Sequence, residues 1–197
     1  MRTQVGVANR VNVRKMAVIG MLSAISVMLS MTPLGFIPLG PTSATIMHIP
    51  VIIGAIVEGP IVGASIGFIF GFTSFVRALT VPNITSFAFI NPLVSIVPRI
   101  LMGIVSYYIY KVIFNITKKA MVAGLATGAI GSLVNTFGVL GMIYIVYAQR
   151  YVEAIGKDVS AAGAVILGIA TTNGIPEAIV GALVVSAVVI ALKKSKK

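Results

Sequence analysis

Six apolar segments follow one another along this sequence, with few charged residues inside them. The segments are approximately 16–31, 46–57, 61–76, 91–114, 120–148 and 174–192. A helix needs about 20 apolar residues to cross the hydrocarbon core of a bilayer. Only 10% of the residues are charged, whereas a soluble domain carries about 25%. The sequence therefore predicts an all-α integral membrane protein, in which residues 1–197 form one compact bundle of six transmembrane helices.

Lysine and arginine residues gather on one side of the predicted bundle. Eleven of them flank the helix ends that share a side with both termini, and Arg99 lies inside a span. The three on the opposite side are Arg77, Arg150 and Lys157. Cytoplasmic loops of membrane proteins are enriched in these residues. We therefore expect cytoplasmic N and C termini.

This orientation makes the longer loops the outer ones. They cover residues 32–45, 78–90 and 149–172. The second half of the last loop, AAGAVILGIATT, is apolar, and we expect it to form a short helix packed over the outer mouth. The inner connections are shorter. The tightest is Glu58-Gly59-Pro60, where glycine suits a helix end and proline suits a helix start. A site facing outward is therefore favoured.

The composition excludes several classes of function. The chain has no cysteine and one histidine, which excludes disulfides, thiol catalysis and multi-histidine metal clusters. Its net charge of +11 lies at the termini and in one loop, as topology signals do, so nucleic acid is not an expected partner. The phosphate-binding motif GxxxxGK[ST] is absent. We expect neither enzymatic activity nor a cofactor.

Small residues recur on one face of two predicted helices. Gly63, Gly67 and Gly71 form a GxxxGxxxG pattern, which allows close helix packing inside the bundle. Gly20 and Ala24 form a similar pair in the first helix. That pair suits either internal packing or a docking surface for another membrane protein.

Polar residues inside the spans are the candidate ligand site, because such groups are costly in hydrocarbon. The candidates are Asn91, Arg99, Asn135, Asn173 and Glu177. Arg99 lies about 12 Å into its helix at 1.5 Å per residue, and it could bind a carboxylate with a forked pair of hydrogen bonds. Alternatively, Arg99 and Glu177 could pair with each other and brace the bundle. His48 favours a structural hydrogen bond over a ligand role.

Three stretches of the chain resemble the S components, the substrate-binding subunits of energy-coupling factor (ECF) vitamin transporters. They are TSATIMHIPVIIGAIVEGPIVGASIGFIFGFTSFVRAL, FINPLVSIVPRILMGIVSYYIYK and NGIPEAIVGALV. The resemblance implies a six-helix subunit of the bacterial cell membrane that captures a vitamin from outside. It also implies partners, namely the transmembrane coupling protein EcfT and two cytoplasmic ATPases. The family docks through AxxxA on its first helix, and Gly20-xxx-Ala24 stands at that place here.

Within the family, the HIPVIIG and NPLVS-x-x-PR stretches are most similar to the pantothenate-type branch. Pantothenate carries a carboxylate, two hydroxyls and an amide, which an arginine with amide and hydroxyl partners would suit. The alternatives are a pyridoxine-type, folate or riboflavin S component, or a stand-alone secondary transporter. The last would take up its substrate without an ATPase partner.

Overall fold

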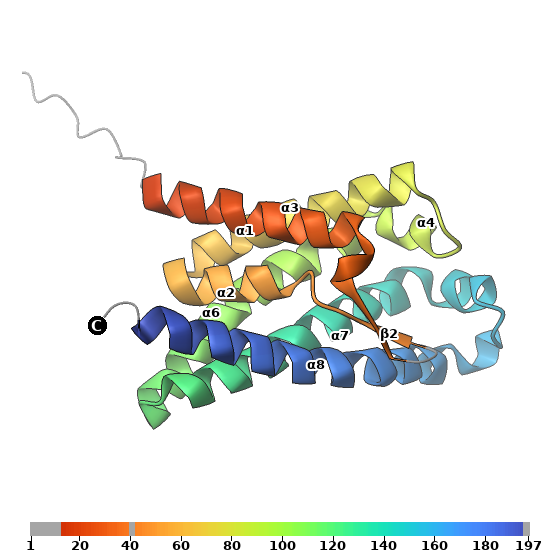
Figure 1. Cartoon of the computed structure of the whole chain (residues 1–197). Helices are drawn as coiled ribbons and strands as arrows, with labels where there is room; N and C mark the ends of the chain where they lie inside the picture. The colour runs from red at the N-terminus through yellow and green to blue at the C-terminus, as the bar shows by residue number, and fades with distance from the viewer. Residues whose placement is uncertain (1–12, 40–41, 195–197) are drawn as a thin grey trace, which may run out of the picture.

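The computed structural model describes residues 13–39 and 42–194 (Figure 1). Its long helices are α1 (Val13–Met31), α3 (Pro60–Thr80), α6 (Val97–Thr117), α7 (Ala120–Ala154) and α8 (Ala162–Lys194). The shorter elements are η1 (Pro33–Gly35), β1 (Phe36–Leu39), β2 (Thr42–Thr45), α2 (Ile49–Glu58), α4 (Ser86–Phe89), α5 (Pro92–Ser95) and η2 (Val159–Ala161).

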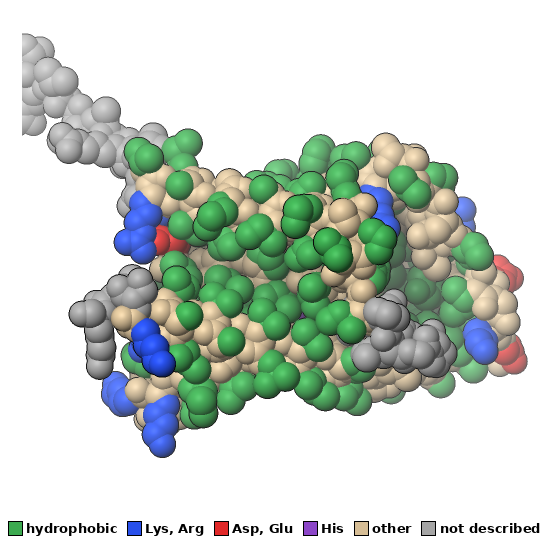
Figure 2. Space-filling model, in the orientation of Figure 1, with side chains coloured by type: hydrophobic (Ala, Val, Ile, Leu, Met, Phe, Trp, Pro, Cys, Tyr) green, Lys and Arg blue, Asp and Glu red, His purple; other side chains and the backbone are tan. Residues whose placement is uncertain are grey.

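The helices lie side by side as a bundle with two distinct ends. Figure 1 shows the start of α1 and the end of α8 at one end, which we call the terminal end. The β1–β2 hairpin, α4 and the connection from α7 to α8 lie at the other, which we call the hairpin end. Figure 2 shows hydrophobic side chains over the surface between the ends, with a group of lysine and arginine side chains at the terminal end. This distribution suits a bundle surrounded by lipid.

The expected helical membrane protein is confirmed in outline. Among the described residues, five helices are long and apolar enough to cross a membrane, and α2 is a shorter apolar helix. Six crossings and cytoplasmic termini therefore stay predictions. Some of the cations used for orientation lie outside the described residues, namely Arg2, Arg10, Lys196 and Lys197.

The expected outer loop at 149–172 is wrong for most of its length. Helix α7 continues to Ala154 through a kink at Tyr147 (φ −137°, ψ 19°), and the apolar stretch expected as a separate short helix is the first part of α8. Pro176 lies inside α8 without ending it. A proline removes one backbone donor, which apolar helices tolerate when neighbouring helices pack along them. Helix α8 packs extensively against α7.

The other two segments expected as outer loops also acquire structure. The first folds into an antiparallel hairpin in which Phe36 pairs with Thr45 and Leu39 with Thr42. In the second, α3 continues to Thr80 before α4 begins. The predicted helix at 91–114 is divided into α5 and α6, with Ile96 between them.

The glycine pattern of α3 packs against the α5–α6 segment, as predicted. A Cβ atom added to Gly67 would lie 2.3 Å from the backbone oxygen of Arg99, and one added to Gly71 would lie 2.6 Å from that of Ser95. Gly63 meets Gly103 equally closely. Only hydrogen side chains fit these contacts, so the glycines fix where α6 and its Arg99 lie relative to α3.

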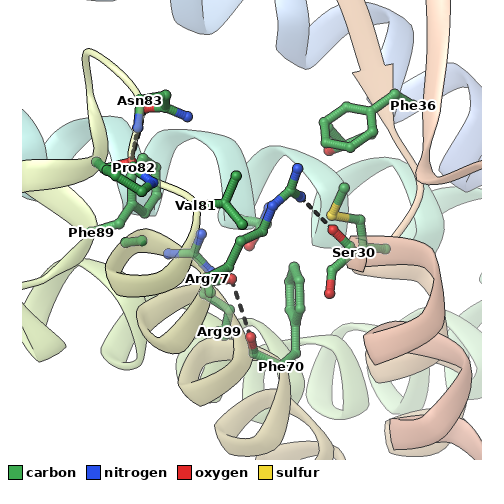
Figure 3. A pocket seen from close by; sticks show the side chains of 15 residues that line it. Ser30, Phe36, Phe70, Arg77, Val81, Pro82, Asn83, Phe89 and Arg99 are labelled. Carbon is green, nitrogen blue, oxygen red and sulfur yellow. Dashed lines mark hydrogen bonds between the residues drawn. The ribbon is translucent and has the colours of Figure 1, made fainter. Parts of the chain in front are cut away.

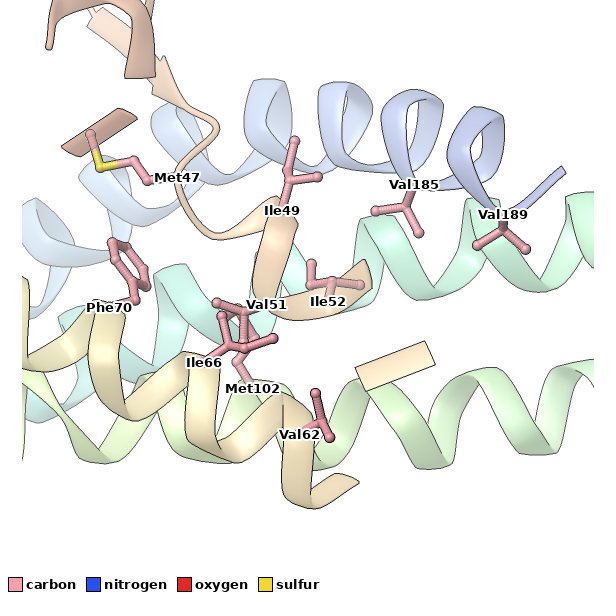
Figure 4. Close-up of a cluster of buried hydrophobic side chains, with 10 residues drawn as sticks. All are labelled: Met47, Ile49, Val51, Ile52, Val62, Ile66, Phe70, Met102, Val185 and Val189. Atoms are coloured by element: carbon pink, nitrogen blue, oxygen red, sulfur yellow. The ribbon is translucent and has the colours of Figure 1, made fainter. Parts of the chain in front are cut away.

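Helix α2 lies at the centre of the bundle. Figure 4 shows Ile49, Val51 and Ile52 of α2 among buried side chains of α3, α6 and α8. Gly59 ends the helix with a φ of +102°, a conformation that favours glycine, and Pro60 begins α3. The predicted tight turn is therefore confirmed.

His48 precedes α2 and is fully buried. Its Nε2 lies 2.8 Å from the hydroxyl oxygen of Ser132, which donates its own hydrogen to the carbonyl of Gly128. The contact joins the start of α2 to α7, in agreement with the structural role expected for this histidine.

Candidate functional site

A cavity of about 330 Å³ lies at the hairpin end of the bundle, within the size range of small-molecule sites. Figure 3 shows that its wall is built by segments far apart in the chain. The lining residues come from α1, both strands, α3, α4, α6, α7, the segment after α3 and the segment between β2 and α2. They are Ser30, Phe36, Thr45, Met47, Phe70, Ser74, Arg77, Ala78, Val81, Pro82, Asn83, Ser86, Phe89, Arg99 and Asn135.

Arg99 enters this cavity from the first turn of α6 and is only 5% exposed. Its Nη1 donates to the carbonyl oxygen of Val94 (2.6 Å). Its guanidinium carbon lies 5.6 Å from the ring centroids of both Phe70 and Phe89, which are cation–π distances. Its Nε is buried without a hydrogen-bond partner. The side chain is thus held in place by one hydrogen bond and two aromatic rings.

Asn135 lines the same cavity from α7 and is 8% exposed. Its Oδ1 is buried and has no partner among the described residues. Arg99 and Asn135 thus bring a guanidinium and a side-chain amide to the wall of the same cavity. Two of the five predicted site residues, Arg99 and Asn135, therefore meet on one cavity.

Arg77 is a cavity residue that the sequence reasoning missed. It was interpreted as an outer cation, but its Nη1 donates to the carbonyl oxygen of Ser30 at the end of α1. Its guanidinium carbon also lies 5.4 Å from the ring centroid of Phe36. The spacing of Phe70, Ser74 and Arg77 places all three on one face of α3, and this signal could have found it.

The charge of the cavity wall has one sign. Arg77 and Arg99 are its charged residues, and no carboxylate is among the described side chains that line it. In a low-dielectric site of this kind, two guanidinium groups favour an anionic ligand. Among the described residues, no group of three or more histidine, aspartate and glutamate side chains could hold a metal ion.

Glu177 lies beside the cavity rather than in its wall. Its Oε1 accepts hydrogen bonds from the backbone N–H (3.0 Å) and the hydroxyl (2.5 Å) of Thr45, and its Oε2 accepts from the hydroxyl of Thr136 (2.6 Å). The alternative in which it pairs directly with Arg99 is not observed, since no ion pair joins these two described side chains. Its carboxylate accepts hydrogen bonds from the hairpin and from α7.

The remaining two predicted residues lie outside the cavity wall. Asn91 caps α5 by accepting from the N–H of Leu93 (3.0 Å), and its amide donates to the hydroxyl of Tyr147 (3.3 Å). Asn173 is half-buried on α8. Their spacing in the sequence placed them on the faces of Arg99 and Glu177, but the break at Ile96 separates Asn91 from the helix that carries Arg99.

Gly20 and Ala24 lie on an exposed face of α1. A Cβ atom added to Gly20 would meet no atom within 4 Å. The opposite face of α1 carries buried serines, and Ser26 donates to the carbonyl of Met47 (2.8 Å). The small pair therefore takes no part in packing within the bundle, which leaves the docking interpretation as a prediction.

Comparison with known families adds independent information to this geometry. A family model described as "ECF transporter, substrate-specific component" matches residues 14–189, which include every long helix and the whole cavity wall. The chain belongs to this family. This ECF substrate-specific component is therefore a multi-pass protein of the bacterial cell membrane, and its family consists of transporters rather than enzymes.

Two relatives of this ECF component are named for their substrate. The chain is 33% identical over 170 residues to the pantothenic acid transporter PanT of Lactococcus lactis subsp. cremoris, covering 79% of this chain and 81% of the relative. It is 32% identical over 162 residues to the pantothenate transporter PanT of Leuconostoc mesenteroides subsp. mesenteroides, covering 79% of each. The resemblance found in the sequence is thus confirmed at the level of the family.

Proposed function

We propose that this ECF substrate-specific component binds pantothenate in the cavity at the hairpin end and serves its uptake. The observation that carries the proposal is a cavity lined by Arg77, Arg99 and Asn135, with no carboxylate among the described side chains of its wall. The names of the two relatives point to the same substrate.

The chemistry of the cavity suits the groups that pantothenate carries. The guanidinium of Arg99 would bind the carboxylate, because charge-assisted hydrogen bonds are the strong ones. Asn135 Oδ1 would accept from a hydroxyl or the amide N–H. The apolar part of the wall, including Phe70 and Met47, would contact the hydrocarbon part of the vitamin.

The proposal includes a topology and a set of partners. The bundle crosses the membrane six times with α2 as its short span, and the hairpin end faces outward so that the cavity captures the vitamin from outside. Both termini then lie in the cytoplasm. We expect uptake to use the coupling protein EcfT and two cytoplasmic ATPases, as membership of the ECF transporter family implies.

A direct test is to purify the protein and look for a co-purifying vitamin by mass spectrometry. Titration of the emptied protein with pantothenate should then give saturable binding with one site per chain. Pyridoxine, folate and riboflavin are the matched competitors, and each should fail to displace pantothenate at equal concentration. Binding of one of them in preference to pantothenate, or binding of no vitamin, would contradict the proposal.

The proposed docking surface, formed by Gly20 and Ala24 on α1, can be tested separately from vitamin binding. Gly20→Leu or Ala24→Leu should prevent EcfT from co-purifying with this protein, because a leucine side chain blocks the close helix approach that small residues allow. Vitamin binding should stay unchanged, since this face lies on the outside of α1. Gly168→Leu is the matched control, because Gly168 is also exposed with no atom within 4 Å of an added Cβ. Transport by the Gly20→Leu variant at the wild-type rate would refute the assignment.

A further inference from the structure

The carboxylate of Glu177 joins three segments that meet at the cavity. Glu177 projects from α8, and its three hydrogen bonds reach Thr45 at the end of β2 and Thr136 of α7. The side chain is 5% exposed. Among the described residues it makes no ion pair within 4 Å. A buried carboxylate is costly, and the three hydrogen bonds from the threonines offset that cost and fix its position.

Thr45 is the contact of Glu177 that lies in the cavity wall. It lines the cavity and pairs across the hairpin with Phe36, which also lines it. The next residue, Ile46, donates its N–H to the carbonyl of Gly35 (3.0 Å). The base of the hairpin is thus part of the cavity wall, and Glu177 binds that base through the backbone N–H of Thr45 as well as through its side chain.

The second oxygen of Glu177 reaches the other side of the cavity. Thr136 is the neighbour of Asn135, the lining residue with the unpaired Oδ1. The Thr136 hydroxyl also lies 3.2 Å from the carbonyl of Ser132, whose side chain contacts His48. One carboxylate therefore connects the hairpin base to the part of α7 that carries Asn135.

We propose that Glu177 is a positioning residue, which holds the base of the hairpin in the cavity wall and does not contact the ligand. This inference rests on the proposed function for its ligand, and it replaces the substrate-contact role expected for Glu177 from the sequence. Its carboxylate already accepts three hydrogen bonds from the two threonines, and the side chain is not part of the cavity wall. A carboxylate in direct contact would also repel an anionic ligand.

The test uses Glu177→Gln and Thr45→Val in the full chain. Glutamine keeps the shape of the side chain but makes neutral hydrogen bonds, which are about half as strong as charge-assisted ones. In the protein without ligand, we expect amide hydrogen exchange in residues 36–46 to become at least about tenfold faster in Glu177→Gln. Exchange in the rest of the bundle should stay at the wild-type rate.

Pantothenate titration of the same variants gives the second readout. Each should bind about tenfold more weakly, since a loosened wall must be ordered when the ligand binds. The double variant should lose less than the product of the two single losses, because both changes break the same contact. Glu153→Gln is the matched control. It removes one carboxylate from an exposed position on α7 and should change neither readout.

Two results would overturn the inference. One is unchanged hairpin exchange in Glu177→Gln together with lost pantothenate binding, which would make Glu177 a ligand contact. The other is additive losses in the double variant. The exchange measurement needs no ligand, so it decides the role of Glu177 at the hairpin even if the wild-type protein binds no pantothenate. That last result would contradict the proposed function alone.

Discussion

Replacing Arg99 by alanine is expected to weaken pantothenate binding by about 30-fold or more, the largest effect on binding that we predict. The variant leaves the carboxylate of the ligand in a buried cavity without the guanidinium that lies between Phe70 and Phe89. Removing one partner of a buried charged pair costs about 2–5 kcal/mol, because the other charge stays desolvated. Calorimetric titration of the purified protein measures the change directly.

Two further arginine variants make this result specific. Arg99→Lys keeps the charge but loses the planar fork, so an intermediate loss is expected. Arg150→Ala is the matched control, since Arg150 lies on α7 over the ring of Phe87 (4.3 Å) and does not line the cavity. Equal losses in Arg99→Ala and Arg150→Ala would show that overall charge, rather than the cavity, determines binding. Wild-type affinity in Arg99→Ala would refute the site.

Replacing Gly67 by alanine is expected to destabilise the protein by about 1–3 kcal/mol, a large effect for a single methyl group. The added Cβ would lie 2.3 Å from the backbone oxygen of Arg99, so α3 and α6 must move apart. Arg99 is the residue proposed to bind the carboxylate of pantothenate. A shift of its backbone should therefore lower pantothenate affinity as well as stability. Denaturant unfolding in detergent, followed by helical circular dichroism, measures the first effect.

Gly141→Ala is the control for this change. A Cβ atom at Gly141 would meet nothing within 4 Å, and alanine favours helix over glycine by about 1 kcal/mol. Its stability should therefore equal or slightly exceed that of the wild-type protein. If Gly67→Ala were as stable as Gly141→Ala, the two helices would not approach as closely as the structure shows.

The sequence predicted the architecture well where the signal is local. Hydropathy marked the long helices, the Glu58-Gly59-Pro60 turn marked a boundary, and the GxxxGxxxG pattern marked the close contact between α3 and α6. Each of these signals depends on residues near one another in the chain. The boundary expected at residue 174 failed for a related reason. The apolar stretch before Pro176 can start a helix or continue one, and its packing against α7 decides which.

For the candidate site, the sequence predicted individual residues but not which of them lie together. The cost of burying polar groups singled out Arg99, Asn135 and Glu177 without any knowledge of the fold. It could not say that Arg77 of α3 shares the cavity with Arg99, or that the segment expected as the first outer loop folds back over it. The helical period puts Arg77 on one face of α3 with Phe70 and Ser74, but it does not show which segments meet that face.

The sequence by itself determined that this chain is a helical membrane protein with a few costly polar residues, because apolar length and buried charge are properties of single segments. The tertiary structure alone decided what those residues touch. Glu177 bonds to Thr45, which is 132 residues away in the chain, and to Thr136, which is 41 residues away. Contacts over such separations depend on how whole helices pack, and that packing separates a residue that faces the ligand from one that holds the wall.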